Sequence, residues 1–425
     1  MKKYESYKDS GVGWIGKIPS HWSCVPFRRI AKVQCNLVRP SENLTMFQIS
    51  PDSIEKNSGK IIKTRTVEEA KVDSDNHRFY KGQILYSKIR PLLNKVTIAP
   101  YDGLCSADMY PISTIENTEY VMYYMLSEAF LSSVKNIVAD RVKMPKINQD
   151  ELKNTDFVIP PFSEQQVIVD YLKDKTLKIE QYVSARERER ELLDSLKQSE
   201  IANVVTKGLN PNVRMKDSGI FWVPQIPSHW KTTKLKHILV KLNREKSEDA
   251  ELLVCSNKGK VIKKGDTKMG LVADNNDIYQ GVCKGDLLIH GMDTWHGAIA
   301  ISDYDGMCTP VVHVCDSNQN KKFVAFYLQF MALSKVFKLI SNGVRQNTSD
   351  FRSWDKVGAI PIMLPPLEEQ QAIVDYIEAK LSKIDSCMAD LQAEIDYLKE
   401  FKQRLISDVV TGQICVAKPQ RGEQQ

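Results

Sequence analysis

Two stretches of the chain combine helical spacing of apolar residues with an absence of helix breakers. Residues 162–206 and 367–411 each follow a Pro-Pro pair and contain neither proline nor glycine. Proline suits the first turn of a helix, Ser163 to Gln166 has the form of a capping box, and Glu368 with Glu369 suits a positive helix N-terminus. The sequence therefore predicts two helices of about 44 residues, each about 66 Å long.

The apolar positions of the second stretch follow alternating steps of four and three, which predicts a coiled-coil seam. Its members are Ile377, Leu381, Ile384, Met388, Leu391, Ile395, Leu398, Leu405 and Val409, with Lys402 at the one polar step. The first stretch is less regular, because ARERERE (Ala185 to Glu191) interrupts it; we expect a solvated helix face there. Its apolar residues are Val167, Ile168, Tyr171, Leu172, Ile179, Tyr182, Val183, Leu192, Leu193, Leu196, Ile201 and Val204.

The segments before each long helix alternate short β-branched or aromatic runs with turn residues. Val96 to Ala99 and Val311 to Val314 are such runs, and a helical stretch follows each of them, at Val121 to Val138 and at Phe323 to Ile340. This mixture predicts two compact α+β domains of about 150 residues.

The sequence is written twice. KDSGVGWIGKIPSHW from Lys8 returns as KDSGIFWVPQIPSHW from Lys216, and IPPFSEQQVIVDYL from Ile159 returns as LPPLEEQQAIVDYI from Leu364. Further blocks, such as YDGLCS and YDGMCT, keep the same order and nearly the same spacing. The chain is therefore a tandem duplication of a unit of about 205 residues.

The repeat predicts how the parts are arranged. The second compact domain starts where the first helix ends and stops where the second helix begins, and its radius of gyration of about 15 Å is too small to span 66 Å. The helices should therefore pack antiparallel, with one domain at each end and a pseudo-twofold axis between them. The predicted domains are 1–160 and 211–364, the helices lie in 161–210 and 365–415, and 416–425 is a disordered tail.

Composition and charge narrow the classes of function that the chain can have. The two predicted compact domains carry net charges of +5 and +6, whereas residues 161–210 and 365–425 carry −1 and −4. This distribution suits two separate contacts with a polyanion. The nine cysteines show no spacing typical of zinc or of a disulfide framework. No apolar run approaches the about 20 residues of a membrane helix, and we expect a cytoplasmic protein.

Exposed basic loops are the candidates for DNA contact, because Arg, Lys, Asn and Gln read base edges and basic groups bind phosphates. In the first domain Pro91 should end a strand and project two of them, and a second basic loop precedes the helix. The first-domain candidates are Lys88, Arg90, Arg141, Lys143 and Lys146, and the second-domain candidates are Lys258, Lys260, Lys263, Lys264, Arg345, Gln346 and Asn347. SKIRPLLNKV aligns with HGMDTWHGAI between shared blocks, so two different half-sites should be read.

Catalytic signals are weak. There is no GxxxxGK[ST] loop and no Asp/Asn/Ser-Pro-Pro-aromatic motif of an amino-methyltransferase; Ile159-Pro-Pro-Phe comes close but lacks a hydrogen-bonding side chain. His21 and His229 of the repeated IPSHW have no adjacent nucleophile or carboxylate and should pack against the neighbouring tryptophans. One alternative is a self-contained Mg²⁺-dependent endonuclease built on Asp52, Glu69 and Lys71, and another is a coiled-coil scaffold with no role in DNA binding.

The repeated W-IPxHW, the KGxxLxxxxRP of the first copy and the repeated PPxxEQ followed by IVDY resemble the specificity subunits of type I restriction-modification systems, the HsdS family, over nearly the whole chain. The resemblance implies two target-recognition domains that each read one half of a split double-stranded DNA site, and helices that set the gap and bind two modification subunits. It also implies motor-nuclease restriction subunits. S-adenosylmethionine, ATP and Mg²⁺ are expected to bind to the modification and restriction subunits and not to this chain. The expected partner contacts are Glu164, Gln165, Gln166, Glu369, Gln370 and Gln371.

Overall fold

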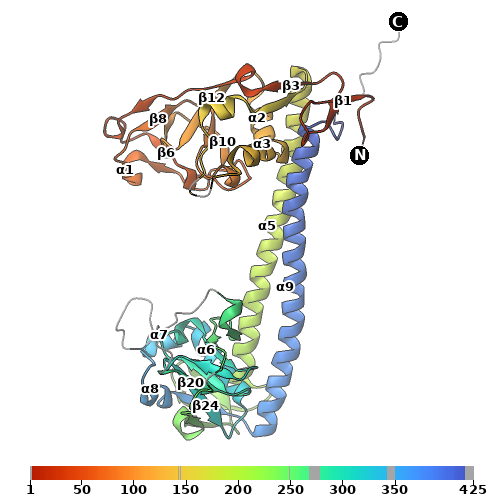
Figure 1. The fold of residues 1–425 in the computed structure, drawn as a ribbon. Helices are drawn as coiled ribbons and strands as arrows, with labels where there is room; N and C mark the ends of the chain where they lie inside the picture. Colours follow the sequence, from red (N-terminus) through yellow and green to blue (C-terminus); the bar gives the residue numbers. More distant parts are fainter. Residues whose placement is uncertain are drawn as a thin grey trace. The chain divides into compact units, whose positions relative to one another are not determined.

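The computed structural model describes residues 2–141, 143, 145–247, 249–267, 278–341 and 350–416. Its contacts divide the chain into two compact units. Unit 1 comprises Met1–Glu187 with Ala393–Gln425, and unit 2 comprises Arg188–Gln392. Two long helices, α5 (Phe162–Lys207) and α9 (Leu367–Val410), each contribute one segment to each unit (Figure 1). They occupy the two stretches that the sequence predicts as long helices.

Head 1, the part of unit 1 that precedes α5, is made of short strands and short helices. Its helices are α1 (Val67–Ala70), α2 (Thr118–Met125), α3 (Glu128–Val138) and α4 (Gln149–Lys153). Its strands are β1 (Tyr7–Asp9), β2 (Lys17–Pro19), β3 (Ser23–Pro26), β4 (Ala31–Val33), β5 (Leu37–Val38), β6 (Phe47–Ile49), β7 (Arg65–Thr66), β8 (Asn76–Phe79), β9 (Ile84–Ser87), β10 (Val96–Ile98), β11 (Gly103–Cys105), β12 (Met109–Thr114) and β13 (Asp156–Ile159). They form a sheet in the order β10-β9-β12-β4, a second in the order β5-β8-β11-β6-β7, and the pairs β1-β2 and β3-β13.

Head 2, residues 215–364 of unit 2, repeats the four-stranded sheet and the outer strand pairs of head 1. Its helices are α6 (Lys321–Leu333), α7 (Val336–Ile340) and α8 (Trp354–Gly358). Its strands are β14 (Met215–Ile220), β15 (Val223–Pro227), β16 (Lys231–Lys234), β17 (Leu239–Lys241), β18 (Leu253–Cys255), β19 (Val261–Lys263), β20 (Gln280–Val282), β21 (Leu287–His290), β22 (Ile299–Ile301), β23 (Gly306–Cys308), β24 (Val312–Ser317) and β25 (Pro361–Leu364). The order β17-β24-β21-β22 matches β4-β12-β9-β10, and β16-β25 matches β3-β13, whereas the pairs β18-β19 and β20-β23 replace the five-stranded sheet. The predicted duplication is therefore present in the fold.

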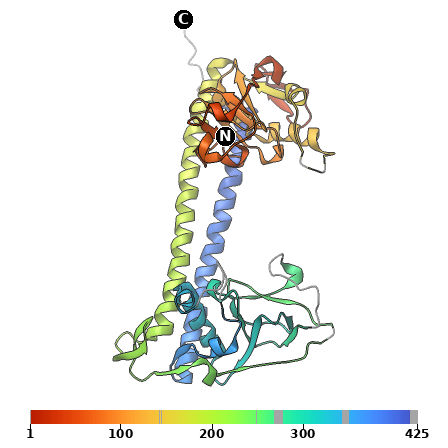
Figure 2. The ribbon, with the colours of Figure 1, turned by 90° about the vertical axis from the view of Figure 1, so that its left-hand side faces the viewer.

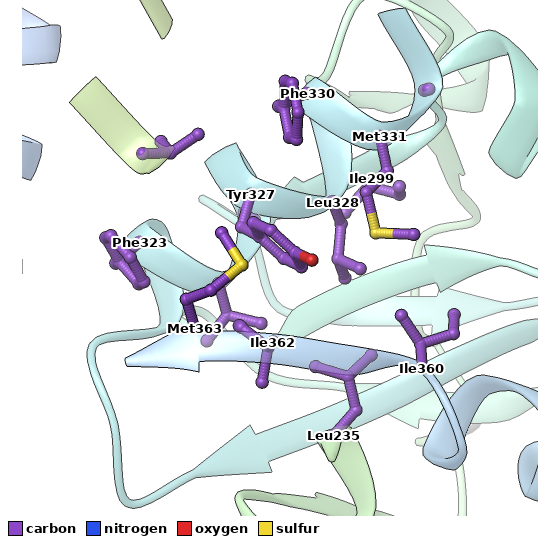
Figure 3. Close-up of a cluster of buried hydrophobic side chains, with 14 of the residues drawn as sticks. Leu235, Ile299, Phe323, Tyr327, Leu328, Phe330, Met331, Ile360, Ile362 and Met363 are labelled. Carbon is purple, nitrogen blue, oxygen red and sulfur yellow. The ribbon is translucent and has the colours of Figure 1, made fainter. Parts of the chain in front are cut away.

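Each head packs its core against both long helices. The main core of unit 1 joins α2, α3 and β13 to Leu172 of α5 and to Val409 of α9. The main core of unit 2 joins α6 and β25 to Val205 of α5 and to Ile373 of α9. Figure 3 shows part of this second core, in which side chains of α6 such as Tyr327 lie over those of β25. Every head is thus fixed to the helix of its own repeat and to the helix of the other repeat.

Within each unit the segments of α5 and α9 run antiparallel, side by side in both views (Figure 2). In unit 1 the Lys402 ammonium lies 3.1 Å from Glu180, and in unit 2 the Lys197 ammonium lies 2.7 Å from Asp385. These two pairs are equivalent under the repeat offset of 205 residues. The predicted seam of α9 is confirmed, because all nine apolar members are buried or half-buried.

Several local expectations were wrong. The helix predicted over Val121 to Val138 is broken at Ser127, whose hydroxyl accepts the N–H of Phe130 and caps α3. The second predicted helix is likewise split into α6 and α7, at residues 334–335. Ser163 is not a cap, because α5 begins at Phe162 and the Pro161 carbonyl accepts the Gln165 N–H.

The charged run of α5 is not simply a solvated face. Arg186 pairs with Glu394 at 3.1 Å and Glu187 with Lys399 at 2.9 Å, both within unit 1, while Arg190 hydrogen-bonds Gln392 within unit 2. These polar pairs continue the contact between the helices where apolar residues are missing. In contrast, four residues that the sequence places among the apolar positions of α5 are exposed: Val167, Tyr182, Leu192 and Leu196.

Candidate nucleic-acid interface

In head 1 the basic side chains gather at the loop that follows β9. We call residues 88–93 the β9 loop. Arg90 has a left-handed backbone, with φ 45°, immediately before a 3-10 turn at Pro91–Leu93. The neighbouring segment holds the loop in place, since the Arg90 N–H donates to the Pro145 carbonyl at 2.9 Å and the Ile147 N–H donates to the Lys88 carbonyl at 3.0 Å. Arg90 itself is exposed.

This pairing brings together two basic groups that are far apart in sequence. A β-bridge joins Ile89 to Lys146, so that Lys88 and Arg90 lie beside Lys146. Lys88 is half-buried, with its ammonium 5.5 Å from the centre of the Tyr110 ring. Lys146 is exposed and only loosely paired, 3.8 Å from Asp108. The arrangement offers several cations at one edge of head 1, as a contact with phosphates and base edges requires.

Arg141 and Lys143 differ in what they can contribute to this edge. Arg141 donates through both terminal nitrogens to the Glu151 carboxylate and also hydrogen-bonds the Lys146 carbonyl. The Arg141 guanidinium holds the pKa of Glu151 below its usual range, so both groups stay charged at neutral pH and largely cancel each other. Lys143 is exposed and makes no ion pair with a described residue. Arg141 therefore shapes the loop, whereas Lys143 is available for contact.

The predicted candidates of head 2 lie on the β18–β19 hairpin and beyond it. Lys258 and Lys260 are exposed in its turn. Lys263 pairs with Glu251 at 2.7 Å, and that hydrogen bond raises the pKa of Lys263. Lys264 is half-buried. The remaining candidates, Arg345, Gln346 and Asn347, lie outside the described residues.

The corresponding turn of head 1 faces the long helices. Under the repeat, Ser58-Gly59-Lys60 matches Lys258-Gly259-Lys260. Lys60 pairs with Glu180 of α5 at 2.6 Å, and the Asn57 carbonyl accepts a hydrogen bond from Gln403 of α9 at 2.7 Å. The turn therefore has a structural use in head 1. In head 2 the Asn257 carbonyl would lie 3.6 Å from a β carbon on Gly297, so this turn is close to the end of the loop equivalent to the β9 loop.

The sequence analysis aligned the equivalent loop of head 2 with the β9 loop but selected none of its residues as candidates for DNA contact. We call residues 291–296 the β21 loop. The Phe351 N–H donates to the Gly291 carbonyl at 3.1 Å, which repeats the bond from Ile147 to Lys88. Here Asp293 occupies the position of Arg90 and lies 3.4 Å from His290 and 3.8 Å from His296. The alignment of SKIRPLLN with HGMDTWHG was the signal that identified this loop.

The repeated EQQ motifs tie each head to its helix. The Asn117 N–H donates to the Gln165 side chain at 2.9 Å, and the Asn320 N–H donates to that of Gln370 at 3.0 Å. Gln165 and Gln370 are fully buried and offer no exposed surface to a partner subunit; their contact with one stays a prediction. The other four predicted contacts are not fully buried. Among them, Gln166 and Gln371 repeat the same tie, since each accepts a hydrogen bond from the side-chain amide of the neighbouring asparagine.

His21 packs against Trp22, with ring centres 6.4 Å apart, and the histidines of both IPSHW motifs have carboxylate partners. His21 lies 2.9 Å from Glu164, which also accepts the indole N–H of Trp22 at 3.0 Å. His229 and Trp230 repeat both contacts with Glu369, at 2.7 and 3.1 Å. The expectation of no carboxylate partner was wrong, because each glutamate comes from a helix start about 140 residues away. The contacts between the IPSHW and EQQ motifs thus hold each head against the first turn of its own helix.

The residues of the endonuclease alternative make local contacts. Asp52 lies 3.5 Å from Lys63 and accepts a hydrogen bond from Ser50. The Glu69 carboxylate accepts the Thr66 N–H at 2.9 Å and completes the cap of α1. Among the described residues, no three His, Cys, Asp or Glu side chains are grouped so that they could hold a metal ion. In the same part of the chain, no helix is long and apolar enough to cross a membrane.

The chain is similar to known DNA specificity subunits. The profile of a family described as the type I restriction modification DNA specificity domain matches residues 43–185 and 227–397. The EcoDI specificity subunit of Escherichia coli is 41% identical over 155 residues, 36% of this chain and 35% of that protein, so the match spans about a third of this relative. A putative MjaX specificity subunit of Methanocaldococcus jannaschii is 25% identical over 442 residues, covering 97% of this chain and 98% of that one.

One solved structure shows the same fold. It comes from a study of complex assembly and conformational transition of the type I restriction-modification system, and its chain is 14% identical to this one with a TM-score of 0.72. The likeness covers 93% of this chain and 99% of the other.

Proposed function

Because the chain belongs to the family of type I restriction-modification DNA specificity subunits, we propose that its two heads each read one half of a split DNA site. The observation that carries this proposal is the repeat of one sheet topology with different loops. The four-stranded sheets have the same strand order, and the β9 and β21 loops are held by the same backbone bond. A shared strand order with different side chains in the equivalent loops is what two heads that read different DNA sequences require.

We further propose that the long helices bind two modification subunits and set the distance between the half-sites. Leu192 and Leu196 are exposed one helical turn apart on α5. The repeat places Tyr397 and Phe401 at the equivalent positions of α9, and their rings stack 6.4 Å apart. Tyr397 is exposed. An apolar pair that recurs once in each copy suits two copies of one partner.

In this proposal the chain performs no chemistry itself. Methyl transfer from S-adenosylmethionine belongs to the modification subunits, and ATP- and Mg²⁺-dependent cleavage belongs to restriction subunits. The chain would act in the cytoplasm, where these partners meet double-stranded DNA. Glu164, Glu369, Gln166 and Gln371 remain candidates for contact with the modification subunits beside the helix starts.

The test is to purify the modification subunits with and without this chain and to sequence the methylated positions on genomic DNA. We expect methylation at one split sequence only when the chain is present. Methylation by the isolated chain would contradict the proposal. So would DNA cleavage by the isolated chain with Mg²⁺, provided that Asp52→Ala abolishes it.

A further inference from the structure

The β9 and β21 loops occupy the same place in the two heads. Each follows the strand that pairs with the long strand of its four-stranded sheet, β9 with β12 and β21 with β24. Each is held from outside by an equivalent backbone bond, from Ile147 to Lys88 and from Phe351 to Gly291, and the β9 loop has a further one from the Arg90 N–H to the Pro145 carbonyl. The two loops are therefore anchored alike, but their backbones differ at the central residue, where Arg90 has φ 45° and Asp293 has φ −114°.

The central side chains of the two loops have opposite charge. Arg90 and Asp293 are equivalent under the offset of 203 residues that relates this part of the repeat. Arg90 carries five N–H donors, whereas a carboxylate only accepts. Two side chains of opposite hydrogen-bonding character at equivalent positions are expected if the position discriminates between bases.

The backbone at Arg90 indicates that its side chain is retained for use. A left-handed residue with a β carbon costs about 1–2 kcal/mol, and glycine avoids this cost. This loop region accepts glycine elsewhere, because Asn94 (φ 44°) is matched in head 2 by Gly297 (φ 80°). Arg90 (φ 45°) is exposed and is not needed for packing. Strain of this kind concentrates at functional sites.

Asp293 has two histidine neighbours and stays accessible to solvent. Burial lowers the pKa of His290, and the His290 Nδ1 accepts the Asp293 N–H at 3.1 Å, so this imidazole is neutral at pH 7. The Asp293 side chain is 42% exposed. Phosphates and the acceptor atoms of guanine repel a carboxylate, whereas the N4 amino group of cytosine donates to it. Adenine also offers an amino group, N6, but its N7 acceptor lies beside that group, so cytosine is the base that best suits a carboxylate in a DNA-reading loop.

We propose that Arg90 reads a guanine through its O6 and N7 atoms in one half-site, and that Asp293 accepts a hydrogen bond from the N4 amino group of a cytosine in the other. This inference rests on the proposed function. It adds which residues read bases, which base each reads, and that the two readers occupy equivalent positions.

The experiment uses the complex of the full chain with its modification subunits and maps methylated sites by sequencing. Arg90→Gly should relax one G·C position of one half-site, reducing discrimination there by about 5- to 160-fold, while the other half-site is unchanged. Asp293→Asn should relax one G·C position of the other half-site by a similar factor. Arg90→Gly also relieves the backbone strain, so loss of folding is not an expected cause of the change.

Matched controls separate readout from backbone effects. Asn94→Gly relieves a left-handed residue of the same region, at a side chain that is 1% exposed, and should leave the preferred sequence unchanged. Asp303→Asn removes an exposed carboxylate elsewhere in head 2 and should also leave it unchanged. If the complex methylates a split site and Arg90→Gly or Asp293→Asn leaves its sequence intact, this inference fails while the proposed function stands.

Two further outcomes would overturn the inference. If Arg90→Gly weakens binding to all sequences equally and lowers the salt dependence of binding by about one, Arg90 contacts a phosphate rather than a base. If the wild-type complex methylates no split site, the inference falls together with the proposed function.

Discussion

Gly412→Ala is expected to destabilise unit 1 by about 2–5 kcal/mol. Gly412 follows the end of α9 with φ 75°, so an alanine there has an unfavourable left-handed backbone that costs about 1–2 kcal/mol. A β carbon at this position would lie 2.3 Å from Cδ of Pro19 and 3.1 Å from Cζ3 of Trp22. Trp22 is fully buried and the proline ring is rigid, so relieving the clash should cost a further about 1–3 kcal/mol.

The control is Gly82→Ala in the same unit. Gly82 has φ 86°, and a β carbon there meets no atom within 4 Å. This variant should carry the backbone cost alone, about 1–2 kcal/mol. The smaller conformational freedom of alanine in the unfolded chain affects both variants equally and cancels in the comparison.

Urea unfolding followed by tryptophan fluorescence measures both variants. We expect a lower midpoint for Gly412→Ala than for Gly82→Ala, with similar slopes. The difference reports how tightly the end of α9, which belongs to the second repeat, is held against head 1. Equal midpoints would refute the reasoning, because the contact of Gly412 with Pro19 and Trp22 would then contribute nothing.

Two further predictions concern buried polar groups. Glu180→Ala should destabilise unit 1 by about 1–3 kcal/mol, because it leaves the Lys402 ammonium unpaired while only 14% of the Lys402 side chain is exposed. As the control, Glu187→Ala removes an exposed ion pair of α5 and should cost under about 1 kcal/mol in the same urea assay. Burial lowers the pKa of His77, so its contribution is present above the unfolded pKa of about 6.5 and is lost as the pH falls towards the folded value. His77→Gln, which copies Gln280 of head 2, should flatten the decline of unit 1 stability below pH 6.5 in a series of urea titrations; an unchanged decline would exclude His77 as its source.

Local patterns were enough to predict the long helices and the repeat. The absence of proline and glycine after each Pro-Pro pair located α5 and α9, and the steps of four and three located the buried face of α9. The offset between the copies anticipated the matching strand orders. These features depend on residues close in sequence or on direct comparison of the two copies, so they can be predicted from the sequence alone.

Contacts between distant residues could not be predicted. A charged run has the same pattern whether it faces water or partners on another helix, and the partner of Arg186 is Glu394. The carboxylate beside His21 lies on α5, and the segment that pairs with the β9 loop comes from residues 145–147. The burial of Gln165 likewise depends on Asn117, whose N–H donates to the Gln165 side chain from 48 residues away.

The most direct test of the whole account lengthens the helices. Inserting four helix-forming residues after Ala185 and after Asp390, which are equivalent under the repeat, adds about 6 Å to each helix. The insertions replace the local pairs near Arg186 and Arg190 but leave the cores of both heads intact. Four residues are about one turn, so each head should rotate by only about 40°.

Methylated sites made by this altered complex should be sequenced beside those of the wild type. The account predicts unchanged half-site sequences and a gap longer by about one or two base pairs, since B-DNA rises about 3.4 Å per base pair. A matched insertion of two residues would turn each head to the opposite face of the helix and should abolish methylation. An active four-residue variant with an unchanged gap would contradict the claim that the heads read the half-sites and the helices set the distance between them.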